Sequence, residues 1–210
     1  KVGGDSNAFT NTDITNYYCL LPKENIETAF WLESDRMLEL DFSQKVLDVQ
    51  KNVVCEEFKQ RYLNKPYGDA YLLLRPLTYK VHPYRWQTIG KDISHIRDAN
   101  LQDVKDFFFK HYAPNNAIMS ISGNFEKDKI IELVKKWFGS IEKRNIAVRN
   151  LPVEPVQNEA RFEYVERDVP LDTIYKAFHM CPRTHKDFYA VDLISDILSN
   201  GKSSRLYNEL

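Results

Sequence analysis

The chain has 210 residues, of which 43% are hydrophobic and 13% aromatic, so it can bury a core and is not a disordered segment. Its 29 Lys and Arg residues face 30 Asp and Glu residues, and this formal net charge of -1 excludes nucleic-acid binding driven by a basic surface. The three cysteines, Cys19, Cys55 and Cys181, are far apart and odd in number, which favours free thiols over a disulfide framework.

The sequence contains no apolar run long enough to span a bilayer, so we expect no membrane span. It opens without Met and stops inside a helical pattern. We therefore expect both ends to be cut, so that a removed leader would be invisible. The sequence leaves the compartment undefined.

The first predicted elements are two strands, about Asn7–Thr10 and Ile14–Leu21, on either side of an Asn-Thr-Asp turn signal. The next is a helix, whose apolar face is formed by Ile26, Ala29, Phe30 and Met37. Asp41 or Ser43 can cap a longer helix that runs to about Asn64.

Further along, the letters DAYLLL predict a short helix that meets Pro76, and HPYRWQTIG predicts a loop. Asn100 is expected to cap a helix that has Asp103 at its third position. A buried strand over Ala117–Ser122 and a strongly periodic helix ending at Gly139 follow.

Glu142–Asn158 carries two prolines and no clean period, and we place a linker at residues 147–159. Strands are predicted near Arg161–Glu166 and Thr173–Met180, followed by a helix over Phe188–Leu198. Because strands and helices mix without regular alternation, the fold class expected is α+β, with a mostly antiparallel sheet flanked by helices.

Two adjacent glutamates in NVVCEEFKQRYLNKPYG lie on the predicted long helix. Spacings of four, three and four residues place four side chains on one stripe: Val46, Gln50, Val53 and Glu57. Glu57 is thus expected on an apolar face, where a carboxylate is costly unless it is paired or bound to a metal. Glu56 lies nearer the side of Asn52 and Gln60 and is expected to face solvent. The alternative is that Glu57 lies at the edge of the stripe and pairs with a lysine or Arg61.

The histidines offer no metal site by local spacing. None of the five forms an i, i+4 pair that could hold zinc on one helix face: His82, His95, His111, His179 and His185. We expect His82 to anchor a loop and His111 to end a helix. The strand near Asn7 is a plausible sheet edge, to which an extended peptide can add as a further strand, although an ordinary edge strand is the commoner case.

Six runs occur in the order NAFTNTDITNYY, VQKNVVCEEFKQRYLNKPYG, HPYRWQTIG, YAPNNAIMSISGNF, VKKWFGSI and GKSSRLYNEL. Together they resemble the pitrilysin/insulinase family of zinc metallopeptidases, in particular bacterial members related to mitochondrial processing peptidase. The resemblance covers nearly the whole chain and implies the metallohydrolase fold of that family.

The resemblance implies a zinc ion held by two histidines of an H-x-x-E-H helix and by a glutamate of a later helix, which matches Glu57 at the end of V-V-x-x-E. Many members carry a further glutamate seven residues earlier; here Gln50 stands at that position, beside the metal ligands rather than among them. The family binds peptide along an edge strand that matches four residues: Asn7, Ala8, Phe9 and Thr10.

The H-x-x-E-H helix should precede Lys1 and is not in this chain, so no catalytic residue is assigned. In family terms, residues 1–146 resemble the later part of the catalytic-type domain. Residues 160–210 resemble the opening strands and helix of a second homologous domain. We hypothesise that this tail docks to complete the first domain, within one chain or by exchange between two chains.

The tail helix does not restore the zinc motif. At the positions of His, Glu and His it has Asp192, Ser195 and Asp196.

The resemblance thus implies a fragment of a zinc metalloendopeptidase that hydrolyses peptides by zinc-bound water. The fragment itself is expected to be inactive and to hold no zinc tightly. Its expected partners are a peptide substrate and a second homologous domain or subunit. The alternative is a non-catalytic peptide-binding or scaffold subunit of the same fold.

Overall fold

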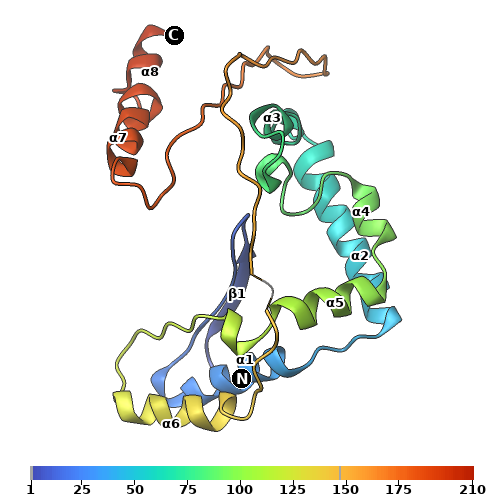
Figure 1. Cartoon of the computed structure of the whole chain (residues 1–210), viewed down its shortest axis with the longest axis vertical. Coiled ribbons are helices and arrows are strands. Elements are labelled where there is room, and N and C mark those ends of the chain that lie inside the picture. Colours follow the sequence, from blue (N-terminus) through green and yellow to red (C-terminus); the bar gives the residue numbers. More distant parts are fainter. Residues whose placement is uncertain (1, 147) are drawn as a thin grey trace.

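The structure, a computed structural model, describes residues 2–146 and 148–210. The first residue of the predicted first unit, Lys1, and the first residue of the predicted linker, Ala147, lie outside this part. Helices dominate (Figure 1). The α-helices are α1 (Ile26–Leu38), α2 (Gln44–Phe58), α3 (Ala70–Thr78), α4 (Ile93–Asp98), α5 (Leu101–His111), α6 (Lys127–Phe138), α7 (Phe188–Ser199) and α8 (Arg205–Glu209). The short turns are η1 (Lys23–Asn25), η2 (Lys59–Leu63, π-helical), η3 (Pro83–Arg85) and η4 (Pro114–Asn116).

The two N-terminal strands form an antiparallel hairpin, as the sequence predicts. β1 (Asp5–Thr10) pairs with β2 (Thr15–Leu20), with Thr10 opposite Thr15 at the closed end. The turn is held by Asn11, whose side-chain Oδ1 accepts the backbone N–H groups of Asp13 and Ile14. This pair makes up the whole sheet in the part of the chain that the structure describes.

Local capping explains where two long helices begin. Ser43 is the N-cap of α2, and its hydroxyl accepts the N–H of Val46. Asn100 and Asp103 form a complete capping box at the start of α5. The predicted short helix before Pro76 is longer than expected, because α3 continues through the proline and closes with a hydrogen bond from Tyr79 N–H to the carbonyl of Arg75.

Two clusters of apolar side chains hold the helices together. α1 and α6 lie side by side (Figure 1), with the Phe30 and Phe138 rings edge to face at 6.4 Å. Phe108 of α5 is 2% exposed and packs on Phe42 and, in a stacked arrangement, on Tyr112. These contacts make Phe108 the centre of the second cluster.

Arg144 ties the segment after α6 to this second cluster. Its guanidinium lies over the rings of Phe108 and Phe109, at 5.1 and 4.9 Å from their centroids. It also donates hydrogen bonds to the carbonyls of Tyr112 and Met37. The chain is therefore anchored at residue 144, directly before the predicted linker.

A tight turn joins α2 and η2 to α3. Tyr67 adopts a left-handed backbone conformation with φ of 60°, and Gly68 is buried beside the preceding helical turn. A Cβ atom at residue 68 would lie 2.7 Å from the carbonyl oxygen of Tyr62. Only glycine fits this approach, so the turn fixes the direction in which α3 leaves.

Three predicted strands are not formed, and the expectation of a mostly antiparallel sheet is wrong for these residues. Ala117–Ser122, Arg161–Glu166 and Thr173–Met180 have no regular secondary structure. Ile118, in the segment predicted to be a buried strand, is 99% exposed, and Phe162 is 84% exposed. A strand needs a neighbouring strand for its N–H and C=O groups, and none of the described residues supplies one here.

The helices of the tail lie apart from the hairpin. α7 and α8 contact each other, and Figure 1 shows them away from β1 and β2. The hairpin is thus not extended by residues 160–210 within this structure, while the predicted division into units at 1–146, 147–159 and 160–210 stays a prediction. Across the described residues, no helix is both long and apolar enough to cross a membrane.

The buried position of Phe108 yields a stability prediction. Phe108→Ala should lower the free energy of unfolding by about 3–5 kcal/mol, since a cavity replaces the ring. Phe107→Ala is the matched control, because this neighbouring ring is 59% exposed; its cost should be about 1 kcal/mol or less. Urea unfolding followed by circular dichroism measures both, and equal costs would contradict the placement of the cluster.

Candidate functional site

Glu57 lies near the end of α2, on a helix side that is open to solvent. The side chain is 42% exposed, and its Oε1 lies 3.0 Å from a guanidinium nitrogen of Arg61, one helical turn later. The pairing with Arg61 that the sequence left open is thus present. Glu56 is exposed and pairs with Lys59, as expected for the solvent-facing member of the two.

The stripe that carries Glu57 faces outward, which corrects the expectation of a buried apolar face. Val46, Gln50 and Val53 are all exposed. The buried side of α2 is instead the one with Cys55 and Phe58. Helical spacing places residues on one stripe but does not say which stripe is covered. Here α4 packs on α2 (Figure 1), while the side chains of Val46 and Val53 stay exposed.

The metal ligands present do not add up to a zinc site. Among residues 2–146 and 148–210, no three His, Cys, Asp or Glu side chains lie together so that they could hold a metal ion. Structural and catalytic zinc sites use three or four protein ligands, so the lone carboxylate of Glu57 does not fit a zinc ion by itself. No catalytic step follows from these residues.

Two histidines support the backbone, and one of them does so as predicted. His82 is the N-cap of η3 and accepts the N–H of Tyr84, so it anchors its loop. His179 contacts the carbonyl of Thr78 through Nε2, and its ring stacks on Tyr79.

His111 and the three polar residues of the tail helix lie on different helices, α5 and α7. His111 ends α5 as predicted, and burial lowers its pKa below the usual value of 6.5. Asp192, Ser195 and Asp196 are exposed on α7.

The four residues expected to position a peptide, Asn7, Ala8, Phe9 and Thr10, all lie in β1 and are all exposed. One edge of β1 is paired with β2, and the other has no neighbouring strand among the described residues. That edge has the geometry for strand addition. Within the same residues, no hydrogen bond or ion pair joins this strand to Glu57 or Gln50.

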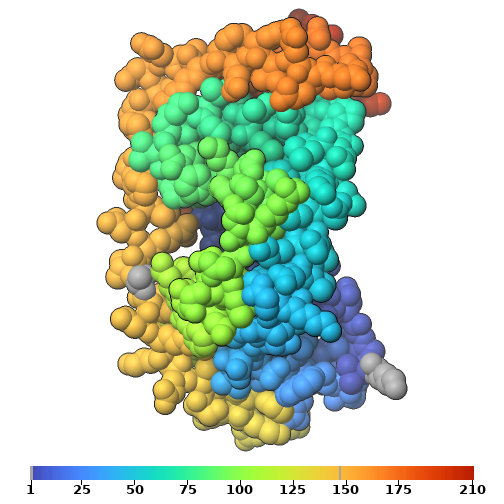
Figure 2. All heavy atoms as spheres, turned by 90° about the vertical axis from the view of Figure 1, so that its right-hand side faces the viewer, coloured from blue at the N-terminus to red at the C-terminus, as the bar shows by residue number. Residues whose placement is uncertain are grey.

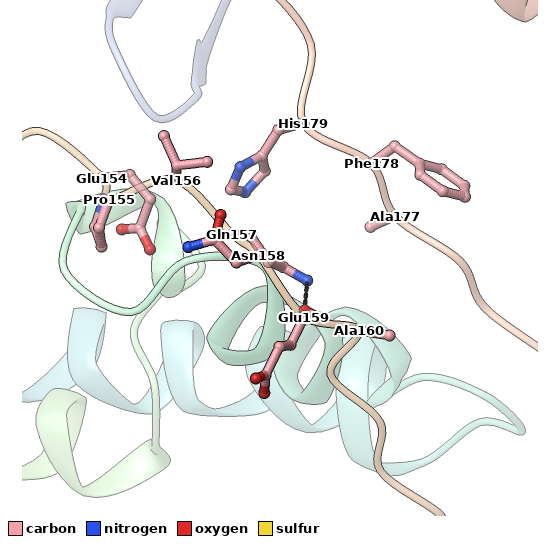
Figure 3. Close-up of a pocket in the computed structure, with 10 residues that line it drawn as sticks. All are labelled: Glu154, Pro155, Val156, Gln157, Asn158, Glu159, Ala160, Ala177, Phe178 and His179. Atoms are coloured by element: carbon pink, nitrogen blue, oxygen red, sulfur yellow. Dashed lines mark hydrogen bonds between the residues drawn. The ribbon is translucent and has the colours of Figure 1, made fainter.

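Sequence reasoning missed an open hollow of about 530 Å³, lined by 154–160 on one side and 177–179 on the other. Figure 3 shows His179 and Phe178 on one run of chain, and Glu154 and Gln157 on the other. A second hollow, of about 440 Å³, lies beside α2 and is lined by Asp48, Lys51, Asn52, Cys55, Glu56, Lys59 and Arg97. Neither is lined by Glu57. The region 154–160 gave only a proline-rich signal, typical of a linker.

Comparisons with known proteins agree on one group of relatives. Residues 98–210 match the family described as the Peptidase M16 inactive domain. The whole chain is 34% identical to the zinc protease PqqE of Helicobacter pylori, covering 48% of that protein, and 26% identical to the uncharacterized zinc protease YmxG of Bacillus subtilis, covering 50%. The chain therefore spans about half the length of these relatives.

A solved structure is similar along the whole chain. The crystal structure of a protease from Helicobacter pylori superposes with a TM-score of 0.84 at 32% identity, covering 100% of this chain and 51% of that one. The described helices and hairpin thus have the arrangement of a known protease structure.

The exposure of Glu57 yields a prediction on stability. Glu57→Gln should change the free energy of unfolding by about 0.5 kcal/mol or less, because an exposed i, i+4 ion pair contributes little. Arg61→Gln removes the same pair from the other side and should have the same small effect. Thermal unfolding of both variants measures this, and a loss of about 2 kcal/mol in Glu57→Gln alone would show that the carboxylate holds the fold.

Proposed function

The chain belongs to the M16 peptidase family, the pitrilysin/insulinase type, and from this premise we propose that it is part of a zinc metallopeptidase that hydrolyses peptides. Its relatives PqqE and YmxG carry the name zinc protease, and the chain aligns with each of them over its full length. Its contribution to the metal site is one ligand, Glu57.

The surroundings of Glu57 support this role. The ion pair with Arg61 is partly exposed and weak, so a metal ion can displace it. The exposed valines at 46, 49 and 53 form an apolar face beside the carboxylate. A helix with the H-x-x-E-H pattern that packs on this face would bring the remaining ligands. Zinc in such a site would activate a bound water for attack on a peptide carbonyl.

The free edge of β1 supports peptide as the substrate class. A peptide that adds beside Asn7, Ala8, Phe9 and Thr10 gains backbone hydrogen bonds that do not depend on its sequence. Alternate side chains of the added strand would point to the two faces of the hairpin. Gln50, two helical turns before Glu57, would lie next to the metal ligands and orient one of them.

A second candidate is a non-catalytic peptide-binding or scaffold subunit of the same fold. The observation that favours it is the match of residues 98–210 to a domain described as inactive. The observation that favours the peptidase is Glu57 itself, because it stands at the end of V-V-x-x-E, where the family has its third zinc ligand.

Zinc analysis of the 210-residue chain tests whether this chain can hold zinc without further ligands. After incubation with zinc and dialysis, the chain should retain far less than one equivalent, since one carboxylate is a poor zinc site. Glu57→Gln should retain the same small amount. Stoichiometric zinc in the wild-type chain, lost in the variant, would contradict the proposal that the other ligands come from elsewhere.

Activity of the complete protein separates the two candidate functions. In the full-length enzyme, Glu57→Gln should lower both zinc content and peptide hydrolysis, the latter by at least about 100-fold, because a metal ligand is lost. Glu56→Gln is the matched control and should keep both. If the full-length protein holds no zinc and hydrolyses no peptide, the scaffold function is correct.

A further inference from the structure

Residues 154–179, here called the strap, have no helix or strand and yet follow α3 closely. Their contacts run along α3 in order: residue 154 meets 80–82, 161 meets 77, 167 meets 69, 171 meets 67, 175 meets 71 and 179 meets 78. The strap thus passes from the C-terminal end of α3 to its N-terminal end and returns. Figure 2 shows the strap, in orange, lying over the part of the molecule that contains α3.

Glu154 is the first residue of the strap, in the run that leads from the C-terminal to the N-terminal end of α3. Its Oε1 accepts the N–H of Lys80 at 2.7 Å, and its Oε2 accepts the N–H groups of Val81 and His82, both at 2.8 Å. Desolvation would raise the pKa of this carboxyl, but the three backbone donors and the charge of Arg161 outweigh it and lower the pKa to about 2. The carboxylate is therefore ionised at neutral pH and bound to three successive amides.

The outgoing run of the strap, through Arg161, and its returning run, through His179, both bind the C-terminal end of α3. Arg161 donates to the carbonyl of Leu77 at 2.8 Å, and His179 lies 2.7 Å from the carbonyl of Thr78. These carbonyls belong to the last turn of the helix, where C=O groups have no N–H partner inside the helix. Each contact gives one of these carbonyls a hydrogen-bond donor. The positive charge of Arg161 is also favourable at the C-terminal end of a helix.

The far end of the strap is held at the turn before α3. The Tyr67 hydroxyl donates to the carbonyl of Leu171 at 2.7 Å and accepts its N–H at 3.0 Å. Arg167 binds the carboxylate of Asp69 at 2.9 Å. A single side chain thus satisfies both backbone groups of the residue at which the strap reverses.

From these contacts we propose that the strap is a clasp that fixes residues 154–179 on α3 and the 80–82 loop, and that residues 148–153 form a hinge between this clasp and the anchor at Arg144. The hinge is bounded by two anchors, Arg144 on the α5 cluster and Glu154 on the 80–82 loop. Between them, Arg149 makes an exposed ion pair with Asp13. Residues 154–159, which the sequence assigns to a linker, are part of the clasp.

The clasp determines which part of the molecule residues 154–179 follow. α3 is joined to α2 through the turn at Tyr67 and Gly68, so the strap moves with the helices that carry Glu57. The hairpin of β1 and β2 is tied to the same region, because the Tyr84 hydroxyl donates to the Asp13 carboxylate at 2.7 Å. The contacts of the clasp form whether or not Glu57 binds zinc.

Limited proteolysis of the wild-type chain tests the position of the hinge. Trypsin should cut after Arg149 before it cuts after Arg161 or Arg167, whose side chains are engaged by the clasp. In Glu154→Ala, cleavage after Arg161 should accelerate by about tenfold, because the first anchor is lost. Glu159→Gln changes an exposed carboxylate on the same run and should leave the pattern unchanged.

Hydrogen exchange gives a second measure that does not require cleavage. The amides of residues 80–82 should be protected in the wild-type chain and in Glu159→Gln, and should exchange about tenfold faster in Glu154→Ala. Equal cleavage after Arg149 and Arg161 in the wild-type chain, or unchanged exchange of these amides in Glu154→Ala, would overturn the clasp.

Discussion

The free carbonyl groups at the end of α3 guide the path of residues 154–179, the strap. A helix leaves its last carbonyls without internal partners, and in α3 those of Leu77 and Thr78 are reached by Arg161 and His179. Both donors belong to a segment without secondary structure, so the strap takes its course from the helix that it crosses. The location of α3 is in turn set by the tight turn after η2.

Signals that act within a few residues were predictable from the sequence. Asn100 and Ser43 cap helices because their side chains reach N–H groups two or three residues away, and the Asn11 turn works in the same way. That Ala117–Ser122 and Arg161–Glu166 do not form strands could not be predicted in this way. Their composition favours extended backbone, but a strand exists only when a distant segment pairs with it.

The candidate site, too, was predictable only in part. Spacing grouped Glu57 with Val46, Gln50 and Val53, and the helix does place them on one side. Whether that side is covered depends on what packs against it, which spacing does not contain. The clasp left no pattern at all, because it consists of single contacts between residues about 70–100 positions apart, such as Glu154 with Lys80.

The turn at Gly68 has a consequence for how this architecture tolerates change. The Tyr62 carbonyl leaves no room for a side chain at residue 68, and the Tyr67 hydroxyl already holds the reversal point of the strap. An inserted or deleted residue there would rotate α3 and carry the strap away from every one of its partners at once. Residues 148–153 bear no such constraint. Among proteins of this architecture, variation in length should therefore accumulate between the two anchors and be absent from the turn before α3.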